Sequence, residues 1–159
     1  MPICYIMVGP PAVGKSTWVE RNCEGDATIL STDAELERIA DVRGETYNQV
    51  FTTEFKAAER IMWDKAAAVR EARGDVYIDR TNMTAASRKK FIDYFKVTGD
   101  YDFIAVVFEL PTMEEWVRRL NNRPGKIIPK HIVDRMTASF EMPEYQEGYS
   151  QIDTVLVDD

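Results

Sequence analysis

Residues 3–17 read ICYIMVGPPAVGKST, and this stretch decides the fold. Its first six residues form a short apolar run with β-branched side chains, which predicts a buried strand. Residues 9–17 then satisfy the pattern G-x-x-x-x-G-K-[ST] in full, directly after that strand. The pattern describes a loop between a strand and a helix, so we expect a helix to follow it.

The glycine-rich loop is a candidate site for the phosphates of a nucleotide. Gly9 and Gly14 let the backbone turn so that successive N–H groups point at one anion, and the following helix N-terminus adds partial positive charge. Lys15 can reach the β- and γ-phosphate oxygens, and Ser16 offers its hydroxyl to Mg²⁺. We therefore expect the loop to bind ATP, with Ser16 at the metal. The residues concerned are Gly9, Pro10, Pro11, Ala12, Val13, Gly14, Lys15, Ser16 and Thr17.

The loop alone does not settle the reaction, because kinases, ATPases, GTPases and regulatory nucleotide sensors all use it. The chain lacks the N-K-x-D signature with which a GTPase recognises guanine. Small kinases of this type need only a short sheet and a mobile basic lid. The length of 159 residues therefore favours a kinase.

Short apolar runs alternate with helical patterns along the rest of the chain. Further strands are predicted at residues 27–30, 76–78, 103–110 and 154–157, and helices at 47–73, from about 84, at 112–121 and from about 129 to 140. Gly74 is expected to end the longest helix. The alternation predicts an α/β fold: a P-loop NTPase-type parallel sheet of four to five strands with helices on both faces. No repeat or linker divides the sequence, so residues 1–159 are expected to form one domain.

Charge is unevenly distributed along the chain. Lys and Arg number 20 against 27 Asp and Glu, a formal net charge of −7. This balance argues against a protein that wraps nucleic acid through many phosphate contacts. Residues 141–159 hold six acids and no Lys or Arg, which predicts an acidic C-terminal tail. The remainder is nearly neutral, so a grip on one strand end through a few phosphates stays possible.

The sequence gives no sign of secretion or membrane insertion. Cys4 and Cys23 form neither a disulfide framework nor a paired metal motif, which fits a reducing compartment. The N-terminal apolar run lacks a basic flank, and no stretch approaches the roughly 18 apolar residues of a membrane span. We expect a cytoplasmic protein without a membrane partner.

Asp33 follows the second predicted strand and is a candidate general base. The carboxyl ends of parallel strands line the ligand crevice, so Asp33 is expected near the tip of the phosphate loop. A carboxylate there could accept the proton of an attacking hydroxyl. The alternative is that Asp33 only caps the next helix, a role that Ser31 or Thr32 could also fill.

The third predicted strand ends in the polar run DRTN at residues 79–82, at the same edge of the sheet. Asp79 could hold a metal-bound water or orient the lysine and serine of the phosphate loop. Thr81 and Asn82 could hydrogen-bond an acceptor. Asp79, Thr81 and Asn82 are therefore candidate substrate-binding residues. For Asn82 the alternative is a cap on the helix that begins near Thr84.

The only strongly basic stretch lies after the fourth predicted strand. Residues 116–135 contain six Lys and Arg side chains against one Asp. Arg118 and Arg119 are expected on a helix, whereas Arg123 lies among loop signals. Residues 118–128 are predicted to form a lid, from which an Arg can close over the transferred phosphoryl group. The alternative is a solvated basic face.

The chain resembles the kinase half of the bacteriophage polynucleotide kinase/phosphatase family and the small P-loop kinases around it. The resemblance rests on residues 9–17, the Asp33 segment, Asp79-x-Thr81-Asn82, and the stretch from Arg118 through Arg123 to Pro129. It implies transfer of the γ-phosphate of ATP to the 5′-hydroxyl end of DNA or RNA, as in nucleic-acid end repair. A phage-encoded protein of this kind would act in the host cytoplasm.

The resemblance also implies roles for individual residues. The catalytic residues would be Lys15, Asp33 as general base, and Arg123 at the reacting phosphate; Ser16 would hold Mg²⁺, Arg119 would contact ATP, and Thr81 and Arg118 the acceptor. The family has an Arg three residues after its base, where this chain has Leu36. Arg38, two residues further on, is the candidate to replace it. No D-x-D-x-T motif is present, so 3′-phosphatase activity is not expected.

Two other functions stay open at this point. The acceptor could be a small molecule such as a nucleoside, a nucleotide or a sugar, which the acidic net charge and the displaced Arg38 favour. The chain could instead be a regulatory nucleotide-binding module without phosphotransfer. Asp33 and Arg123 argue for an enzyme, because binding alone needs no base.

Overall fold

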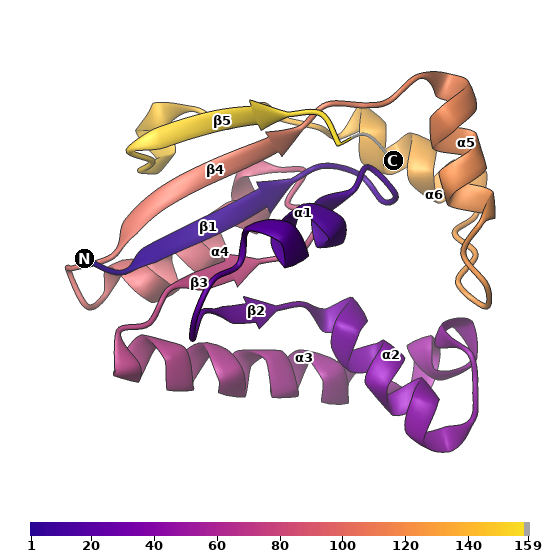
Figure 1. Cartoon of the computed structure of the whole chain (residues 1–159), viewed down its shortest axis with the longest axis horizontal. Coiled ribbons are helices and arrows are strands. Elements are labelled where there is room, and N and C mark those ends of the chain that lie inside the picture. The colour runs from indigo at the N-terminus through magenta and orange to yellow at the C-terminus, as the bar shows by residue number, and fades with distance from the viewer. Residues whose placement is uncertain (158–159) are drawn as a thin grey trace.

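The computed structural model describes residues 1–157, in which parallel strands form one sheet (Figure 1). The strands are β1 (Ile3–Val8), β2 (Thr28–Leu30), β3 (Val76–Ile78), β4 (Asp102–Phe108) and β5 (Gln151–Val155). Their order across the sheet is β2-β3-β1-β4-β5, so β1 lies at the centre. The predicted parallel α/β sheet is confirmed, with five strands.

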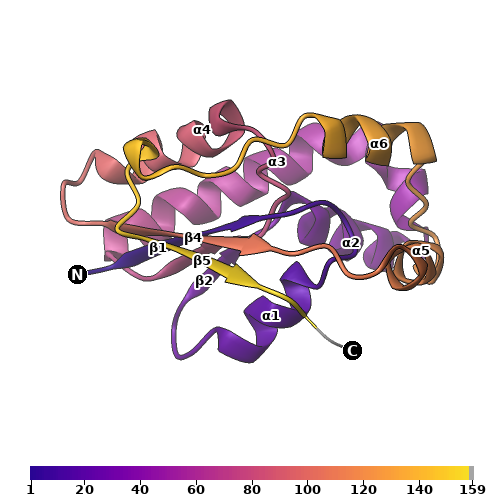
Figure 2. The same cartoon turned by 90° about the horizontal axis from the view of Figure 1, so that it is seen from above.

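Helices cover both faces of the sheet, as predicted. They are α1 (Lys15–Asn22), α2 (Thr32–Arg43), α3 (Tyr47–Ala72), α4 (Ala85–Lys96), α5 (Met113–Asn121) and α6 (Lys130–Ala138), with a 3₁₀ turn η1 (Tyr145–Glu147). Figure 2 shows α1 on one face and α3, α4 and α6 on the other. Within residues 1–157 no helix combines the length and the apolar character that a membrane span requires.

The central strands send buried side chains into two apolar layers. Ile6 and Val8 of β1 join the layer that contains Met62 of α3. Met7, between them, joins the opposite layer together with Val19 of α1. A parallel strand buried on both faces reads as a continuous apolar run, which is why β1 and β4 were recognisable in the sequence.

Hydroxyl side chains determine where two of the helices begin. Ser31 Oγ accepts a hydrogen bond from the Ala34 N–H at 3.1 Å and caps α2. Thr84 and Ser87 form a reciprocal capping box at α4, which confirms the predicted start. Because Ser31 fills the cap of α2, the carboxylate of Asp33 is not used for capping.

Two element ends differ in detail from the prediction. The helix α3 ends just before Gly74, but Arg73 is the residue in the left-handed conformation, with φ at 55°. A Cβ on Gly74 would lie 3.1 Å from Val69 Cγ2, so the glycine serves close packing instead. The last strand lies three residues earlier than predicted at its start, because β4 pairs in register with Gln151–Val155.

The prediction of an acidic tail is wrong for residues 141–157, which are part of the fold. Glu147 pairs with the fully buried Arg88 of α4, at 2.8 Å between Oε1 and Nε. Tyr149 is buried in the core, and β5 forms the edge of the sheet. Asp158 and Asp159 lie outside the described residues.

Candidate active site

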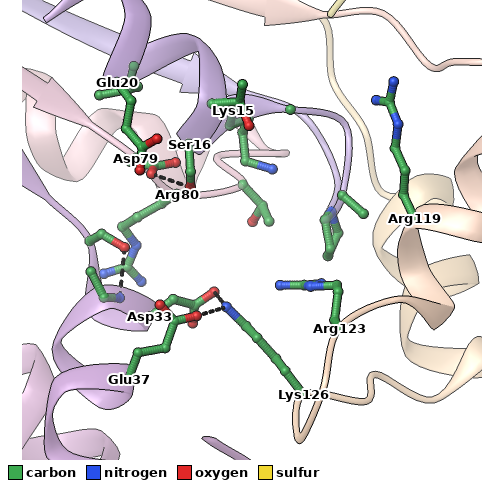
Figure 3. Close-up of a pocket in the computed structure, with 18 of the residues that line it drawn as sticks. Lys15, Ser16, Glu20, Asp33, Glu37, Asp79, Arg80, Arg119, Arg123 and Lys126 are labelled. Carbon is green, nitrogen blue, oxygen red and sulfur yellow. Dashed lines mark hydrogen bonds and ion pairs between the residues drawn. The ribbon is translucent and has the colours of Figure 1, made fainter. Parts of the chain in front are cut away.

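A cavity of about 610 Å³ opens at the carboxyl edge of the sheet (Figure 3). Its walls are the glycine-rich loop with the start of α1, the start of α2, the end of β3, and the connection between α5 and α6. This volume lies in the range of roughly 300–1,000 Å³ that ligand sites occupy. The segments that the sequence placed at one crevice are therefore brought together.

The glycine-rich loop is held by its neighbours in a special backbone conformation. Ala12 and Gly14 have positive φ angles of 64° and 98°. A Cβ on Gly14 would lie 2.6 Å from the Cβ of Val157, so only glycine fits there. The buried Trp116 of α5 donates its indole N–H to the carbonyl of Pro11 at 2.8 Å. The conformation of the loop is thus held by neighbouring residues before a ligand binds.

Lys15 lies inside the loop and donates to its carbonyls. Its Nζ is 2.8 Å from the Gly9 oxygen and 2.6 Å from the Pro10 oxygen. Burial lowers the pKa of Lys15 to about 8, although the nearby carboxylate of Asp79 opposes this effect. A polyphosphate in the loop would restore the preference for the charged form.

Ser16 and Asp79 meet at the start of α1. Ser16 Oγ donates to Asp79 Oδ2 at 2.8 Å. Burial raises the pKa of Asp79, while the hydrogen bond from Ser16 and the charge of Lys15 lower it. This hydrogen bond fits the predicted alternative in which Asp79 orients Ser16, and a substrate-binding role of Asp79 stays a prediction.

The oxygen atoms around Ser16 suit Mg²⁺ that is bound together with a nucleotide better than a metal ion bound by protein ligands alone. Within residues 1–157 no group of three His, Cys, Asp or Glu side chains could hold a metal ion. Mg²⁺ prefers oxygen ligands, keeps several waters and binds mainly through substrate phosphates. The Ser16 hydroxyl and the Asp79 carboxylate beside it are the protein oxygen atoms that would hold such a Mg²⁺ ion and its waters.

Asp33 lies on the opposite wall of the cavity and carries two contacts. Its Oδ1 accepts a hydrogen bond from the hydroxyl of Tyr47 at 2.7 Å. Its Oδ2 is 3.4 Å from Nζ of Lys126. The side chain keeps about half of its surface exposed, so the carboxylate is oriented yet accessible.

Arg123 has the one unsatisfied buried group among the described side chains. Its Nη1 atom is inaccessible to solvent and has no hydrogen-bond partner. In Figure 3 its guanidinium points from the α5–α6 connection into the cavity, toward the space between Lys15 and Asp33. A buried hydrogen-bond donor without a partner is costly, so we expect a ligand to place a hydrogen-bond acceptor at this point.

The other predicted Arg residues line the same cavity. Arg119 donates to the Val157 carbonyl at 2.8 Å and pairs with Glu115 at 2.9 Å. Arg118 also pairs with Glu115, at 2.6 Å. Their contacts with ATP and acceptor stay predictions.

The polar run after β3 divides between the cavity and the scaffold. Thr81 lines the cavity, and its carbonyl accepts the N–H of Gly9 at 2.9 Å. Asn82 does not line the cavity: it is 3% exposed, and its amide donates to the carbonyl of Met7 at 2.8 Å. The prediction that Asn82 binds substrate is therefore corrected, since its side chain is used to join β1 to the end of β3. It is not the cap of α4 either, because Thr84 is.

The family has an Arg three residues after its base, where this chain has Leu36, and Arg38 is the candidate to replace it. Leu36 is completely buried in the layer between α2 and α3 and is not among the residues that line the cavity. Arg38 lines the cavity and pairs with Glu35. Arg38 thus lies at the cavity wall with its guanidinium held by Glu35, and its role toward an acceptor stays a prediction.

Sequence reasoning missed three residues of the site. Arg80 lines the cavity and pairs with Glu59 at 2.6 Å. Tyr47 and Lys126 both contact Asp33. Lys126 lay inside the predicted basic lid, which was a usable signal, whereas nothing in the sequence distinguished Tyr47 from an ordinary helix residue.

The sequence matches the family described as AAA domain over residues 5–143. The chain belongs to this AAA domain family. Among curated proteins, transcription factor bHLH140 of Arabidopsis thaliana is 30% identical over 160 aligned residues. The match covers 94% of this AAA domain chain but only 15% of that protein, so the chain corresponds to a small part of its relative.

Solved structures support the same fold for this AAA domain chain. A kinase candidate from Chloroflexus aurantiacus J-10-fl superposes with a TM-score of 0.72 at 18% identity, over 97% of this chain and 87% of that one. A gluconokinase from Sinorhizobium meliloti 1021 gives a TM-score of 0.51 at 18% identity, over 97% and 82%. At such identities the similarity shows the P-loop NTPase-like α/β fold alone.

Proposed function

We propose that the chain is a kinase that transfers the γ-phosphate of ATP to a hydroxyl group. The observation that carries the proposal is the buried, unpartnered Nη1 of Arg123, which faces the space between Lys15 and Asp33. A phosphate oxygen would satisfy this donor. The transferred phosphoryl group of a kinase lies between the phosphate loop and the carboxylate of the base, where a cation such as Arg123 can contact it. The kinase candidate and the gluconokinase with similar folds support the same reaction type.

The proposed mechanism assigns one task to each residue. Asp33 accepts the proton of the acceptor hydroxyl while the hydroxyl oxygen bonds to the γ-phosphorus. The bond between the γ-phosphorus and the β-γ bridging oxygen breaks, which releases ADP. Lys15 and Arg123 bind the phosphate oxygens on which negative charge is concentrated. Ser16, oriented by Asp79, would hold Mg²⁺, which adds positive charge beside the phosphates when bound.

We propose a small polar hydroxyl compound as the acceptor. Among residues 1–157 no aromatic side chain lines the cavity, which leaves no aromatic ring there for stacking a nucleobase. Its acceptor side is lined by charged side chains such as Glu37, Arg38 and Arg80. Such a wall suits a compound rich in hydroxyl or ionic groups.

The second candidate is the 5′-hydroxyl end of DNA or RNA. It rests on the resemblance of the loop, the Asp33 segment and the lid to the polynucleotide kinase family. Arg38, exposed on the cavity wall, is the residue that would meet an acceptor phosphate. In this case the acceptor should be bound through its phosphates and sugar rather than through its bases.

An acceptor screen at fixed labelled ATP and Mg²⁺ tests both candidates. The acceptors are sugars, polyols and hydroxy acids, nucleosides with and without a 3′-phosphate, and 5′-hydroxyl oligonucleotides. Labelling of the first group supports the small-molecule proposal. Labelling confined to oligonucleotides and nucleoside 3′-phosphates would replace it by the second candidate.

Two variants separate a kinase from a nucleotide-binding module. Asp33→Asn should bind ATP as tightly as the wild type and lose transfer by about 10²-fold or more. Asp41→Asn, on the exposed surface of the same helix, is the matched control and should leave transfer unchanged. A wild-type protein that binds ATP and labels no acceptor would contradict kinase function altogether.

A further inference from the structure

Both oxygens of Asp33 are in contact with side chains from other parts of the chain. Tyr47 is the first residue of α3 and donates its hydroxyl to Oδ1 at 2.7 Å. Lys126 belongs to the α5–α6 connection and lies 3.4 Å from Oδ2. Asp33 of α2 is thus in contact with the start of α3 and with the α5–α6 connection. Figure 3 shows its contact with Lys126.

Tyr47 and Lys126 are themselves held in place. The reciprocal capping box of Thr46 and Gln49 determines the first turn of α3 and so the position of Tyr47. The ammonium of Lys126 lies 4.6 Å from the centre of the Tyr47 ring, within cation–π distance. Its Nζ also contacts Glu37 at 2.8 Å, and the side chain is only 12% exposed.

The backbone of the lid segment, residues 122–129 between α5 and α6, is hydrogen-bonded to the first turn of α3. Asn48 donates from its backbone to Gly125 and from its side chain to Ile127, at 3.1 and 3.0 Å. The N–H of Ile127 in turn donates to Asn48 Oδ1 at 3.1 Å. Gly125 has a φ of 68° and packs tightly against Thr46. The side-chain contacts of Lys126 and these backbone contacts therefore act together to hold the lid segment over the cavity.

We propose that Tyr47 and Lys126 are positioning residues that couple closure of the lid segment to the orientation of the Asp33 carboxylate. The inference rests on the proposed kinase function. Tyr47 anchors Oδ1 from α3, and Oδ2 is the oxygen that contacts Lys126. Lys126 holds Oδ2 from the lid side, and the same docking carries Arg123, three residues earlier in the segment, over the phosphate loop.

The two contacts differ in what an acceptor does to them. The Tyr47 hydrogen bond can persist through the reaction, because Oδ1 is held from α3 and not from the lid segment. The 3.4 Å contact of Lys126 is longer than its 2.8 Å contact with Glu37. An acceptor hydroxyl can therefore take the place of Lys126 at Oδ2 while Glu37 retains the ammonium, so the lid stays closed when the base is in use.

The first experiment needs no acceptor. Amide hydrogen exchange of residues 125–127 is measured in the wild type, Tyr47→Phe, Lys126→Met and the control Lys130→Met, whose exposed ammonium pairs with Asp134 of its own helix. We expect exchange to rise about tenfold in Lys126→Met and about threefold in Tyr47→Phe, and to stay unchanged in the control. Unchanged exchange in both variants would overturn the proposal.

The second experiment uses the acceptor that the wild type labels. In Tyr47→Phe and Lys126→Met, kcat should fall about tenfold while the KM for ATP stays within about twofold, and Lys126→Arg should recover part of the loss. Faster lid exchange with an unchanged kcat would overturn the positioning role. Should the wild type label no acceptor, the proposed function fails, while the exchange data still decide whether Asp33 and the lid are coupled.

Discussion

At the scale of single residues, Arg123 combines a cost to stability with a candidate role in catalysis. Its Nη1 is buried without a partner in the protein alone. A lost hydrogen bond of this kind costs about 1–3 kcal/mol. A ligand that supplies a hydrogen-bond acceptor would remove this cost, which makes Arg123 a sharper indicator of the phosphate position than the basic composition of the lid.

Arg123→Met should separate the two effects. Transfer should fall by about 10³-fold, because the cation at the transferred phosphoryl group is lost. The free energy of unfolding without nucleotide should stay unchanged or rise, because the variant removes an unsatisfied buried donor. Urea unfolding and steady-state kinetics measure the two quantities. A clear loss of stability with intact transfer would show that Arg123 is a structural residue.

Lys15 gives a prediction about protons. Its pKa of about 8 in the free protein should rise when phosphates surround the ammonium, because nearby negative charge favours the protonated form. At about pH 8.5 ATP itself has no proton to give or take, so binding should take up more than about half a proton per ATP. Calorimetry in two buffers of different ionisation enthalpy measures this uptake. It should vanish in Lys15→Arg, whose guanidinium is always charged.

At the scale of elements, the sequence predicted what depends on local pattern and missed what depends on contacts. The run at residues 3–8 coincides with β1, and Thr84 caps α4 as expected. The last strand was misplaced, because its start is determined by pairing with β4 and not by its own weak pattern. Asn82 looked like a site residue because of its place after β3, yet its bond to Met7 is visible only in the folded chain.

The lid segment allows a test with a matched pair of glycines. Gly125 and Gly44 both have a φ of 68°, but a Cβ on Gly125 would lie 2.7 Å from Thr46 Cβ, while one on Gly44 would meet nothing within 4 Å. Both Gly→Ala variants should lose about 1 kcal/mol of stability from the left-handed backbone. Only Gly125→Ala should also increase amide exchange at Ile127 and lower kcat. Equal lid exchange in the two variants would show that the Thr46 contact does not hold the lid.

At the scale of the whole molecule, the C-terminal segment connects the far end of the fold to the active site. After α6 the chain runs along the helical face to η1 and returns through β5 toward α1 (Figure 2). Glu147 holds one end of this path through Arg88, which also donates to the carbonyl of Asn82 at 2.8 Å. At the other end Val157 packs against Gly14. We therefore expect the conformation of the phosphate loop to depend on an ion pair that is remote in sequence.

Glu147→Gln should weaken this connection in a pH-dependent manner. Burial raises the pKa of Glu147, but hydrogen bonds from Arg88 and the Glu144 N–H outweigh it and leave the pKa below its usual 4.5. A carboxylate with a lowered pKa stabilises the fold fully above the unfolded value, and this contribution disappears as the pH falls through the folded value. The variant should therefore be about 2–3 kcal/mol less stable near neutral pH, because Arg88 loses its charged partner in the interior.

The difference between wild type and Glu147→Gln should shrink as the pH falls from 4.5, the pKa in the unfolded chain, through the lower pKa of the folded carboxyl. Urea unfolding at a series of pH values measures it, with Glu71→Gln on the exposed surface of α3 as the control that should change little at any pH. A difference independent of pH would mean that the glutamate acts through shape rather than charge. Because Val157 lies at the end of the same segment, ATP affinity should weaken in Glu147→Gln alone, which would tie the stability of the C-terminal segment to the phosphate loop.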